Sequence, residues 1–481
     1  MKVNKAKIIQ GVVVAAWMIC CFCFFQYYYP NHFFFKEQNQ IFYIIPSTWT
    51  EYLYQPHPLA RLIGDFLTQF YCYKFHGAII ITVAIAILGD LVCRLLRLCK
   101  VNKYIALVIA VIAMTLEALM HTGLHYQLSA TVVKIFFVVF LYSAIFCFKR
   151  RKIYVILPLA AWLIVTLPWK SAYPREWKEY VTCPELWKMS TPDFVYEYFL
   201  SVDNAYYRHN YDKVVELVEN CPGEYRTKEM LFFYYLVQAQ RGTLPDKLMR
   251  FGDPDELGTF YHISAETPMT AIKNINELYW ALGDMTYAER AAMMSNVFSK
   301  DNRNIRMIQR LAEINIVKND TTAAKKYLKI VGNTLIRRYW AWNAWKDERL
   351  MEKRQYVNKQ DTMQAGDNAH WIMMQLLDSN PRNTVALDYM LCSDLLLKDM
   401  DSFKRDYDKY CVETGMPRNK KLYQEALCIY LAGTNAPVEE WQRYIIDTSV
   451  LKRFNEYNAK RGNSMFSDTY WYYFDVKGKK R

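Results

Sequence analysis

Two carboxylates with the surroundings of a possible site, Glu37 and Asp65, lie between the first and second apolar runs of this 481-residue chain, within residues 27–76. Glu37 is surrounded by phenylalanines and side-chain amides, and Asp65 lies on the polar side of a stretch with helically spaced apolar residues. A carboxylate at a membrane surface can act as a general base or a metal ligand toward the head group of a lipid-linked substrate. The alternative is that the aromatic residues only anchor this segment in the interface, and the charge of Glu37 is then dispensable.

A second pair of ionisable residues lies inside apolar runs. Glu117 is 13 residues into the third run and Lys134 is six residues into the fourth. At a rise of ~1.5 Å per residue, both lie about 10 Å below the same membrane surface. Opposite charges at equal depth predict an ion pair; a proton or ion relay that includes His121 is the alternative. His121 and His125 have no third ligand at a fixed spacing, so we expect interface histidines and no metal site.

A third candidate site is a group of cations and tryptophans in the second half of the chain. Its members are Arg337, Arg338, Trp340, Trp342 and Trp345. They open an irregular segment, residues 340–366, that interrupts an otherwise regular helical pattern. Long insertions in helical repeats are often binding loops, so these five residues are candidate binding residues. The alternative is a covered loop whose tryptophans fill a groove.

Membrane-spanning helices must position Glu117 and Lys134, and they flank the loop that carries Glu37 and Asp65. Five apolar runs precede residue 170, and most approach the ~20 residues that a bilayer core requires. They cover approximately residues 8–25, 77–98, 104–124, 128–148 and 153–169. The last is the shortest and contains Pro158. The sequence therefore predicts a transmembrane domain of about five helices over residues 1–169.

Basic residues set the orientation of these runs. The chain carries a net charge of +13, and residues 1–169 hold 15 Lys and Arg but only 5 Asp and Glu. The cations form three clusters, at Lys2–Lys7, Arg94–Lys103 and Lys149–Lys152, that fall on one side of a five-span bundle. The positive-inside rule then places the amino terminus in the cytoplasm and residues 170–481 outside it.

Residues 27–76 form the long outer loop of this topology. One stretch of the loop has apolar residues at helical spacing, after Pro56 and Pro58, with polar residues opposite. The apolar residues are Leu59, Leu62, Ile63, Phe66, Leu67 and Phe70. This pattern predicts an amphipathic helix in the membrane interface, so membrane lipids are expected partners.

Residues 170–481 show helical periods broken by short turns, with no strand-like alternation. The turns recur at His209-Asn210, Arg241-Gly242, Gly283-Asp284, Asn319-Asp320, Lys398-Asp399 and Gly433-Thr434. Their spacings are 32, 42, 36, 79 and 35 residues, and the 79 is close to two units. Periods near 34 with two helices per unit are typical of tetratricopeptide-like solenoids. We therefore predict an all-α protein: a transmembrane bundle followed by a tetratricopeptide-like α-solenoid.

Composition argues against several other classes. The positive charge lies at the ends of apolar runs and forms no basic face, so nucleic-acid binding is not expected. Seven of the twelve cysteines lie before residue 150, in or beside apolar runs, and the other five show no C-x-x-C spacing, which indicates neither a zinc site nor a disulfide framework. No P-loop, nucleophile elbow or dinucleotide fingerprint is present, so the sequence predicts no cofactor.

Several distinctive segments resemble one family of uncharacterised bacterial membrane proteins, defined as a domain of unknown function. They are Tyr27–Pro30, Lys36–Gln40, Gly64–Phe70, Arg310–Asn315 and Thr469–Tyr473. The resemblance covers nearly the whole chain. It implies a bacterial inner-membrane protein with a helical-repeat half in the periplasm, and it carries over no catalytic residue.

Two functions are consistent with this organisation. The favoured hypothesis is an inner-membrane scaffold that presents its solenoid to protein partners in the periplasm. The alternative is a glycosyltransferase-like enzyme or carrier that acts on a lipid-linked glycan at the outer face, with Glu37 or Asp65 as its acidic group. Five spans are fewer than such enzymes usually have, and their paired acidic motif is absent, so a non-enzymatic role is favoured.

Overall fold

The computed structural model describes residues 5–150, 152–167, 187–251, 269–299, 303–357, 369–416 and 418–477. Within these ranges every regular element is a helix, and an isolated antiparallel bridge joins Tyr43 to Thr334. The all-α class is therefore confirmed for this part of the chain.

The chain divides into two compact units. Unit 1 comprises Met1–Asn204, Ser299–Gln309 and Lys325–Ala344, and unit 2 comprises Ala205–Phe298, Arg310–Ala324 and Trp345–Arg481. The predicted domain boundary at residues 169 and 170 lies outside the described residues. Unit 1 thus joins the apolar helices to two short segments from far along the chain.

Four helices of unit 1 are long and apolar enough to cross a membrane. They are α1 (Lys5–Cys23) with its continuation η1 (Phe24–Tyr28), α5 (His76–Leu98), α6 (Lys103–His121) and α7 (Leu128–Arg150). The sequence predicted about five spans. The fifth run forms η4 (Lys152–Val155) and α8 (Ile156–Thr166), and α8 is too short to count as a span by length.

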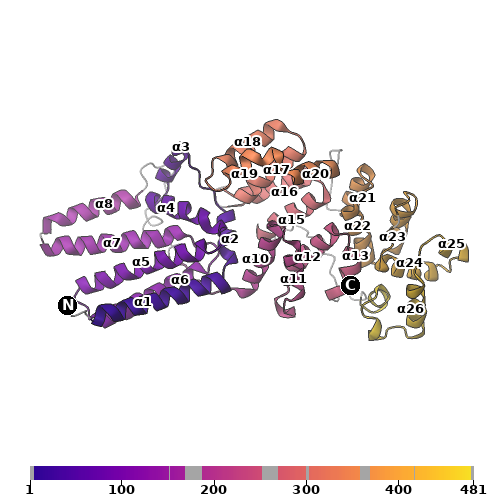
Figure 1. The fold of residues 1–481 in the computed structure, drawn as a ribbon, viewed down its shortest axis with the longest axis horizontal. Coiled ribbons are helices and arrows are strands. Elements are labelled where there is room, and N and C mark those ends of the chain that lie inside the picture. Colours follow the sequence, from indigo (N-terminus) through magenta and orange to yellow (C-terminus); the bar gives the residue numbers. More distant parts are fainter. Residues whose placement is uncertain are drawn as a thin grey trace. The chain divides into compact units, whose positions relative to one another are not determined.

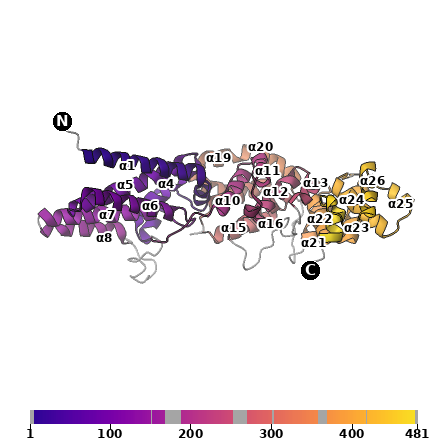
Figure 2. The same cartoon turned by 90° about the horizontal axis from the view of Figure 1, so that it is seen from below.

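Helix α5 is the centre of this bundle, because α1, α6 and α7 all pack against it. Figures 1 and 2 show these helices and α8 running alongside one another. Gly89 allows the close contact with α6, since a Cβ at this position would lie 2.2 Å from the sulfur of Met114. Small residues at such crossings are typical of membrane helices, whose association depends on close packing.

The loop between α1 and α5 is itself helical. It contains α2 (Asn31–Gln38), α3 (Pro46–Trp49), η2 (Thr50–Tyr54), α4 (Pro58–Thr68) and η3 (Gln69–Cys72). Helix α4 corresponds to the predicted amphipathic helix. Its small residues Ala60, Gly64 and Thr68 are buried, and a Cβ at Gly64 would lie 2.6 Å from the backbone nitrogen of Ser129 on α7.

The apolar stripe of α4 faces away from that contact. Leu59, Ile63 and Phe66 are each about two-fifths exposed, at 39%, 38% and 41%. The helix therefore binds the bundle through its small residues and leaves its large apolar side chains at the surface. That arrangement suits a helix whose second face meets lipid.

Helix α8 returns along α7 toward the same loop. Trp162 contacts Phe137 and Phe140 of α7, with ring centroids 5.4 and 5.3 Å apart. At its end, the carbonyl of Thr166 accepts a hydrogen bond of 2.9 Å from the backbone N–H of His57. The chain thus leaves α8 next to the loop that precedes α4.

Unit 2 consists of helices packed mostly against their neighbours in sequence. They are α11 (Tyr211–Glu219), α12 (Lys228–Gln240), α13 (Leu244–Lys247), α15 (Met269–Leu282), α16 (Met285–Val297), α20 (Glu348–Tyr356), α21 (Ala369–Ser379), α22 (Thr384–Leu397), α23 (Met400–Tyr407), α24 (Lys421–Gly433), α25 (Val438–Gln442), α26 (Thr448–Ala459) and α27 (Tyr470–Tyr472). Helices α12 and α22 pack together and are buried on nearly all sides, which makes them the core of the unit. Three further helices, α10 (Phe194–Tyr207), α17 (Ile305–Val317) and α18 (Thr321–Gly332), include residues of both units.

The recurring turns identified in the sequence do connect consecutive helices. His209, Gly242, Gly283, Asn319 and Lys398 all have a positive φ, the conformation that commonly ends a helix. At four of these turns the next residue caps the following helix: the side chains of Asn210, Asp284, Asp320 and Asp399 accept from backbone N–H groups. At the last turn the positive φ falls on Asn435, two residues later than the sequence suggested.

The aromatic carboxyl-terminal segment is part of the core of unit 2. Tyr470 and Trp471 are 0% and 1% exposed. The backbone N–H of Tyr470 donates to the Glu425 carboxylate (2.8 Å), and the Trp471 indole donates to the Glu425 carbonyl (2.8 Å). This segment therefore packs against α24.

Candidate functional site

Helix α2, in the loop after α1, carries the first predicted acidic residue. Glu37 is buried, with its side chain 5% exposed, and Arg337 Nη2 donates to both of its carboxylate oxygens at 2.8 and 2.9 Å. Arg337 Nη1 also donates to Gln309 Oε1 (2.8 Å). The structure thus joins a candidate catalytic residue to a candidate binding residue 300 positions away.

A second buried cation, Arg306, binds Gln38, the residue that follows Glu37 on α2. Arg306 Nη1 donates to both carboxylate oxygens of Asp203, at 2.8 and 3.1 Å, and to Gln38 Oε1 at 3.2 Å. Arg306, Asp203 and Gln38 are each no more than 2% exposed. Because a buried ion is stable only when it is paired and hydrogen-bonded, these contacts fix α2 against the two distant segments of unit 1.

The amino-terminal end of α2 is held by a carboxylate. Glu197 of α10 accepts hydrogen bonds from the backbone N–H groups of Asn31 and His32. These N–H groups have no partner within the helix, and the helix dipole favours a negative charge there. Both ends of α2 are therefore bound by residues distant in sequence.

Three titratable groups at this helix have shifted pKa values. Burial raises the pKa of Glu197 to about 8, although the N–H groups of Asn31 and His32 and the charge of Lys36 oppose the shift. Burial lowers the pKa of Lys36 to about 7, against the charge of Glu197. Burial, together with the nearby charge of Lys36, also lowers the pKa of His32. The pKa values of Glu197 and Lys36 are thus both shifted toward neutral pH.

Asp65 has different partners from Glu37. Its carboxylate accepts a hydrogen bond from the Tyr52 hydroxyl (2.9 Å), and its carbonyl accepts one from Gln40 Nε2 (3.2 Å). Tyr52 is buried, and burial followed by the Asp65 charge raises the pKa of its hydroxyl. The two acidic candidates are thus held by separate sets of side chains.

The structure places Glu117 and Lys134 in contact inside the bundle. Lys134 Nζ lies 2.5 Å from Glu117 Oε2, and both residues are buried. Tyr126 and Thr131 each donate to Glu117 Oε1 at 2.7 Å. This ion pair has the partners that a charge in hydrocarbon requires.

His121 extends the same network toward α2. Its Nε2 is 2.6 Å from Thr131 Oγ1, and its carbonyl accepts from Lys36 Nζ at 2.8 Å. His125 is exposed, whereas His121 is completely buried, so the two histidines differ in environment. A continuous set of polar contacts therefore runs from Glu117 to α2.

The remaining residues of the third candidate site lie on or near the short helix α19 (Arg338–Asn343). Arg338 lies over the Trp342 ring, 5.7 Å from its centroid, and Trp342 is 69% exposed. Trp340 is half-buried on α19, and Trp345 is half-buried in the turn η9 (Ala344–Lys346). The sequence analysis missed Tyr339, which is 76% exposed beside them. Residues 358–366 of the predicted insertion lie outside the described residues.

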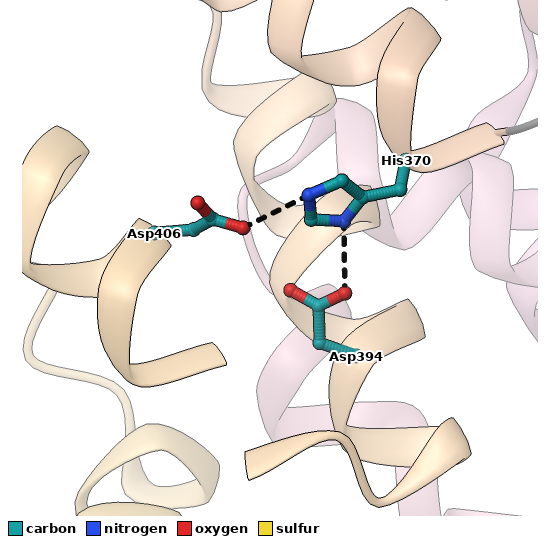
Figure 3. A group of neighbouring side chains, drawn as sticks. All are labelled: His370, Asp394 and Asp406. Atoms are coloured by element: carbon teal, nitrogen blue, oxygen red, sulfur yellow. Dashed lines mark hydrogen bonds and ion pairs between the residues drawn. The ribbon is translucent and has the colours of Figure 1, made fainter. Parts of the chain in front are cut away.

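A further group of titratable residues was missed entirely by the sequence analysis. His370 of α21 lies between Asp394 of α22 and Asp406 of α23, with Nδ1–Oδ1 and Nε2–Oδ2 distances of 3.0 and 3.1 Å (Figure 3). The hydrogen bonds to Asp394 and Asp406 raise the pKa of His370 to about 10, against the effect of burial. Spacings of 24 and 12 residues on three helices match no metal or catalytic motif, so no sequence signal could have identified this group.

Comparison with known proteins gives one match. The model of a family described as a family of unknown function (DUF6057) matches residues 4–172 and 153–477. No curated protein and no solved structure matches the chain.

The Glu37–Arg337 pair can be tested by a double-mutant cycle. Arg337→Gln leaves a buried carboxylate without its counter-ion, so we expect a loss of about 3–5 kcal/mol in the free energy of unfolding. Glu37→Gln combined with Arg337→Gln should recover much of that loss, because the two amides can bond each other. Chemical unfolding in mixed micelles measures both effects. Arg338→Gln is the control on the same helix, and additive effects at residues 37 and 337 would contradict the pair.

A second cycle tests the pair inside the bundle. Lys134→Met should reduce the yield and thermal stability of the detergent-purified protein, because it leaves Glu117 charged in an apolar environment. Adding Glu117→Gln should restore much of both. Asp90→Asn removes the exposed Asp90–Arg94 pair and serves as the control, with an effect below about 1 kcal/mol. Equal damage from Lys134→Met with and without Glu117→Gln would contradict the arrangement.

Proposed function

We propose that this chain, which belongs to the DUF6057 family of unknown function, is a membrane-anchored scaffold that presents helical repeats to protein partners. The proposed location is a bacterial inner membrane, with the amino terminus in the cytoplasm and unit 2 in the periplasm. The observation that carries the proposal is the bidentate pairing of Glu37 with Arg337. A general base must be free to accept a proton, and this carboxylate is instead neutralised by a fixed guanidinium.

The proposed topology has five crossings. Arg94 and Arg97 end α5, and Lys149 and Arg150 end α7, so these cations cluster at one end of the antiparallel helices. Helix α8 follows directly and returns to His57 in the outer loop. Its 11 α-helical residues and the four of η4 span roughly 24 Å, slightly less than the ~30 Å hydrocarbon core. A small local thinning of the bilayer accommodates the difference.

The proposed tetratricopeptide-like character of the second half is supported by its turns. Pairs such as α15 with α16 and α22 with α23 are joined by a residue of positive φ and then a capping Asp. Helix α15 packs against α16 and α12, and α22 packs against α21, α23 and α12. An array of this kind offers extended surfaces for protein partners.

The orientation can be tested with reporter fusions to the full chain. Alkaline phosphatase fused after residue 481 should be active, because the proposed carboxyl terminus is periplasmic, whereas a fluorescent protein that folds only in the cytosol should stay dark. Fusions after Arg150 provide the matched control and should show the opposite pattern. Equal reporter activity at both positions, or the reverse result, would refute the five-crossing topology.

The role of the Glu37 carboxylate distinguishes the scaffold from an enzyme or carrier for a lipid-linked glycan. Glu37→Gln combined with Arg337→Gln removes the charge without leaving an unpaired ion. In a strain that lacks the protein, we expect this double variant to restore the wild-type phenotype at normal protein levels. Asp65→Asn is the parallel test of the other acidic candidate. A stable, inserted double variant that fails to complement would favour the enzymatic alternative.

A further inference from the structure

Four exposed cations gather at one end of the apolar bundle. Helix α5 ends at Leu98 and α6 begins at Lys103, so the short turn between these helices carries Lys100 and Lys103 close together. Lys149, in the last turn of α7, donates a hydrogen bond to the carbonyl of Leu98, which brings the end of α7 to the same turn. We call the exposed residues Lys100, Lys103, Lys149 and Arg150 the cationic end of the bundle.

Negative charge is scarce at this end. Residues 1–169 hold five Asp and Glu, and four of these lie in the loop between α1 and α5 or deep in the bundle. The fifth, Asp90, already binds Arg94 at 2.7 Å. Within the described residues of unit 1, the cationic end therefore carries positive charge that no carboxylate neutralises.

The same cations lie among exposed apolar side chains. Lys103 Nζ lies over the Tyr104 ring, 5.0 Å from its centroid, and the Arg150 guanidinium lies over the Phe146 ring at 4.8 Å. Tyr104 and Phe148 are 50% and 57% exposed. Charge beside apolar surface suits an amphiphile with an anionic head group, because an inorganic anion would contact only the charges.

The turn that carries Lys100 is held in place. The φ of Lys100 is +62°, in the left-handed region that favours glycine. Its N–H donates to the carbonyl of Arg97 (3.0 Å), and Arg97 Nη2 donates to Gln10 Oε1 on α1 (2.6 Å). Beside the turn, Cys93 of α5 and Ala106 of α6 belong to one buried cluster. Contacts with α1, α5 and α6 thus fix the position from which the Lys100 side chain extends.

The ends of membrane-spanning helices lie at the depth of the lipid head groups. Lys and Arg at this depth attract anionic lipids, and each such cation strengthens binding by about fivefold. Lysine and arginine form charge-assisted hydrogen bonds with phosphate oxygens, and a guanidinium can donate two of them in parallel. Several cations held on three helices can therefore contact one head group from different sides.

We propose that Lys100, Lys103, Lys149 and Arg150 bind the head group of an anionic phospholipid, with its acyl chains beside the exposed aromatic rings of α6 and α7. The inference rests on the proposed crossing of a membrane by α5, α6 and α7, and it does not depend on the scaffold role. In the proposed topology the lipid belongs to the cytoplasmic leaflet, which is the leaflet with a negative surface potential.

The test compares two lipids with identical acyl chains, dioleoylphosphatidylglycerol and dioleoylphosphatidylcholine. Each is added to the full chain in dodecyl maltoside micelles, and its affinity is measured by thermophoresis of protein labelled at the carboxyl terminus. We expect the anionic lipid to bind at least tenfold more tightly at low salt, because the two lipids differ in net charge. The preference should largely disappear at about 1 M salt, where the Debye length is about 3 Å.

Two variants test the residues themselves. Lys100→Gly and Arg150→Gln should each weaken binding of the anionic lipid about fivefold and leave that of phosphatidylcholine unchanged. Lys100→Gly should not lower the melting temperature in lipid-free micelles, because its φ suits glycine. Lys74→Gln is the matched control: this exposed lysine also lies over an aromatic ring, that of Phe75 (5.0 Å), but it precedes α5 and so lies at the opposite end of that helix.

Equal affinity for the two lipids, a preference that persists at high salt, or an equal loss of affinity in Lys74→Gln would each overturn the proposal. Competition by inorganic phosphate at concentrations similar to those of the lipid would also overturn it, because the ligand would then be a soluble anion. None of these results bears on the membrane crossings, which the reporter fusions test separately.

Discussion

The requirement that buried charges be paired determines how unit 1 is built. Helix α2 has only eight residues, and Glu37 and Gln38 on it are almost completely buried. A short helix of this kind has little stability of its own. It persists because segments far along the chain bind it: Arg337 supplies an opposite charge to Glu37, Arg306 donates a hydrogen bond to Gln38, and Glu197 accepts from the backbone. The loop between α1 and α5 therefore folds as part of a tertiary structure, and the apolar contacts of α2 are only one part of its stability.

The same constraint operates within the apolar bundle. Glu117 accepts three hydrogen bonds, from Lys134, Tyr126 and Thr131, so its carboxylate has a nearly complete set of donors. Lys36 then bonds the carbonyl of His121, one turn from Glu117 on the same helix. These contacts connect the buried Glu117–Lys134 pair inside the bundle to α2. Removal of one charge in this series would leave its partner in a medium of low dielectric, where an unpaired ion is least stable.

Much of the local structure could be predicted from the sequence. Long apolar runs identified the four candidate spans because helix length is set by bilayer thickness. Gly, Asn and Asp at the turns indicated helix ends because they favour a positive φ or cap the next helix. Long-range pairing could not be predicted. No local pattern connects Glu37 with Arg337, or His370 with Asp394 and Asp406, because helical spacing constrains residues only within a few turns. The partner of Glu37 is 300 residues away, beyond the reach of any such pattern.

The segment that begins at Arg337 contains a buried cation followed by exposed aromatic residues. Arg337 turns inward and bonds Glu37, so it belongs to the structural core of unit 1. Tyr339 and Trp342, two and five residues later, are 76% and 69% exposed. Large exposed aromatic side chains are unfavourable in water and are enriched where proteins contact a partner. The inward Arg337 thus fixes the position of α19, and the outward aromatic residues form an exposed surface, which is the surface that the proposed scaffold role would use.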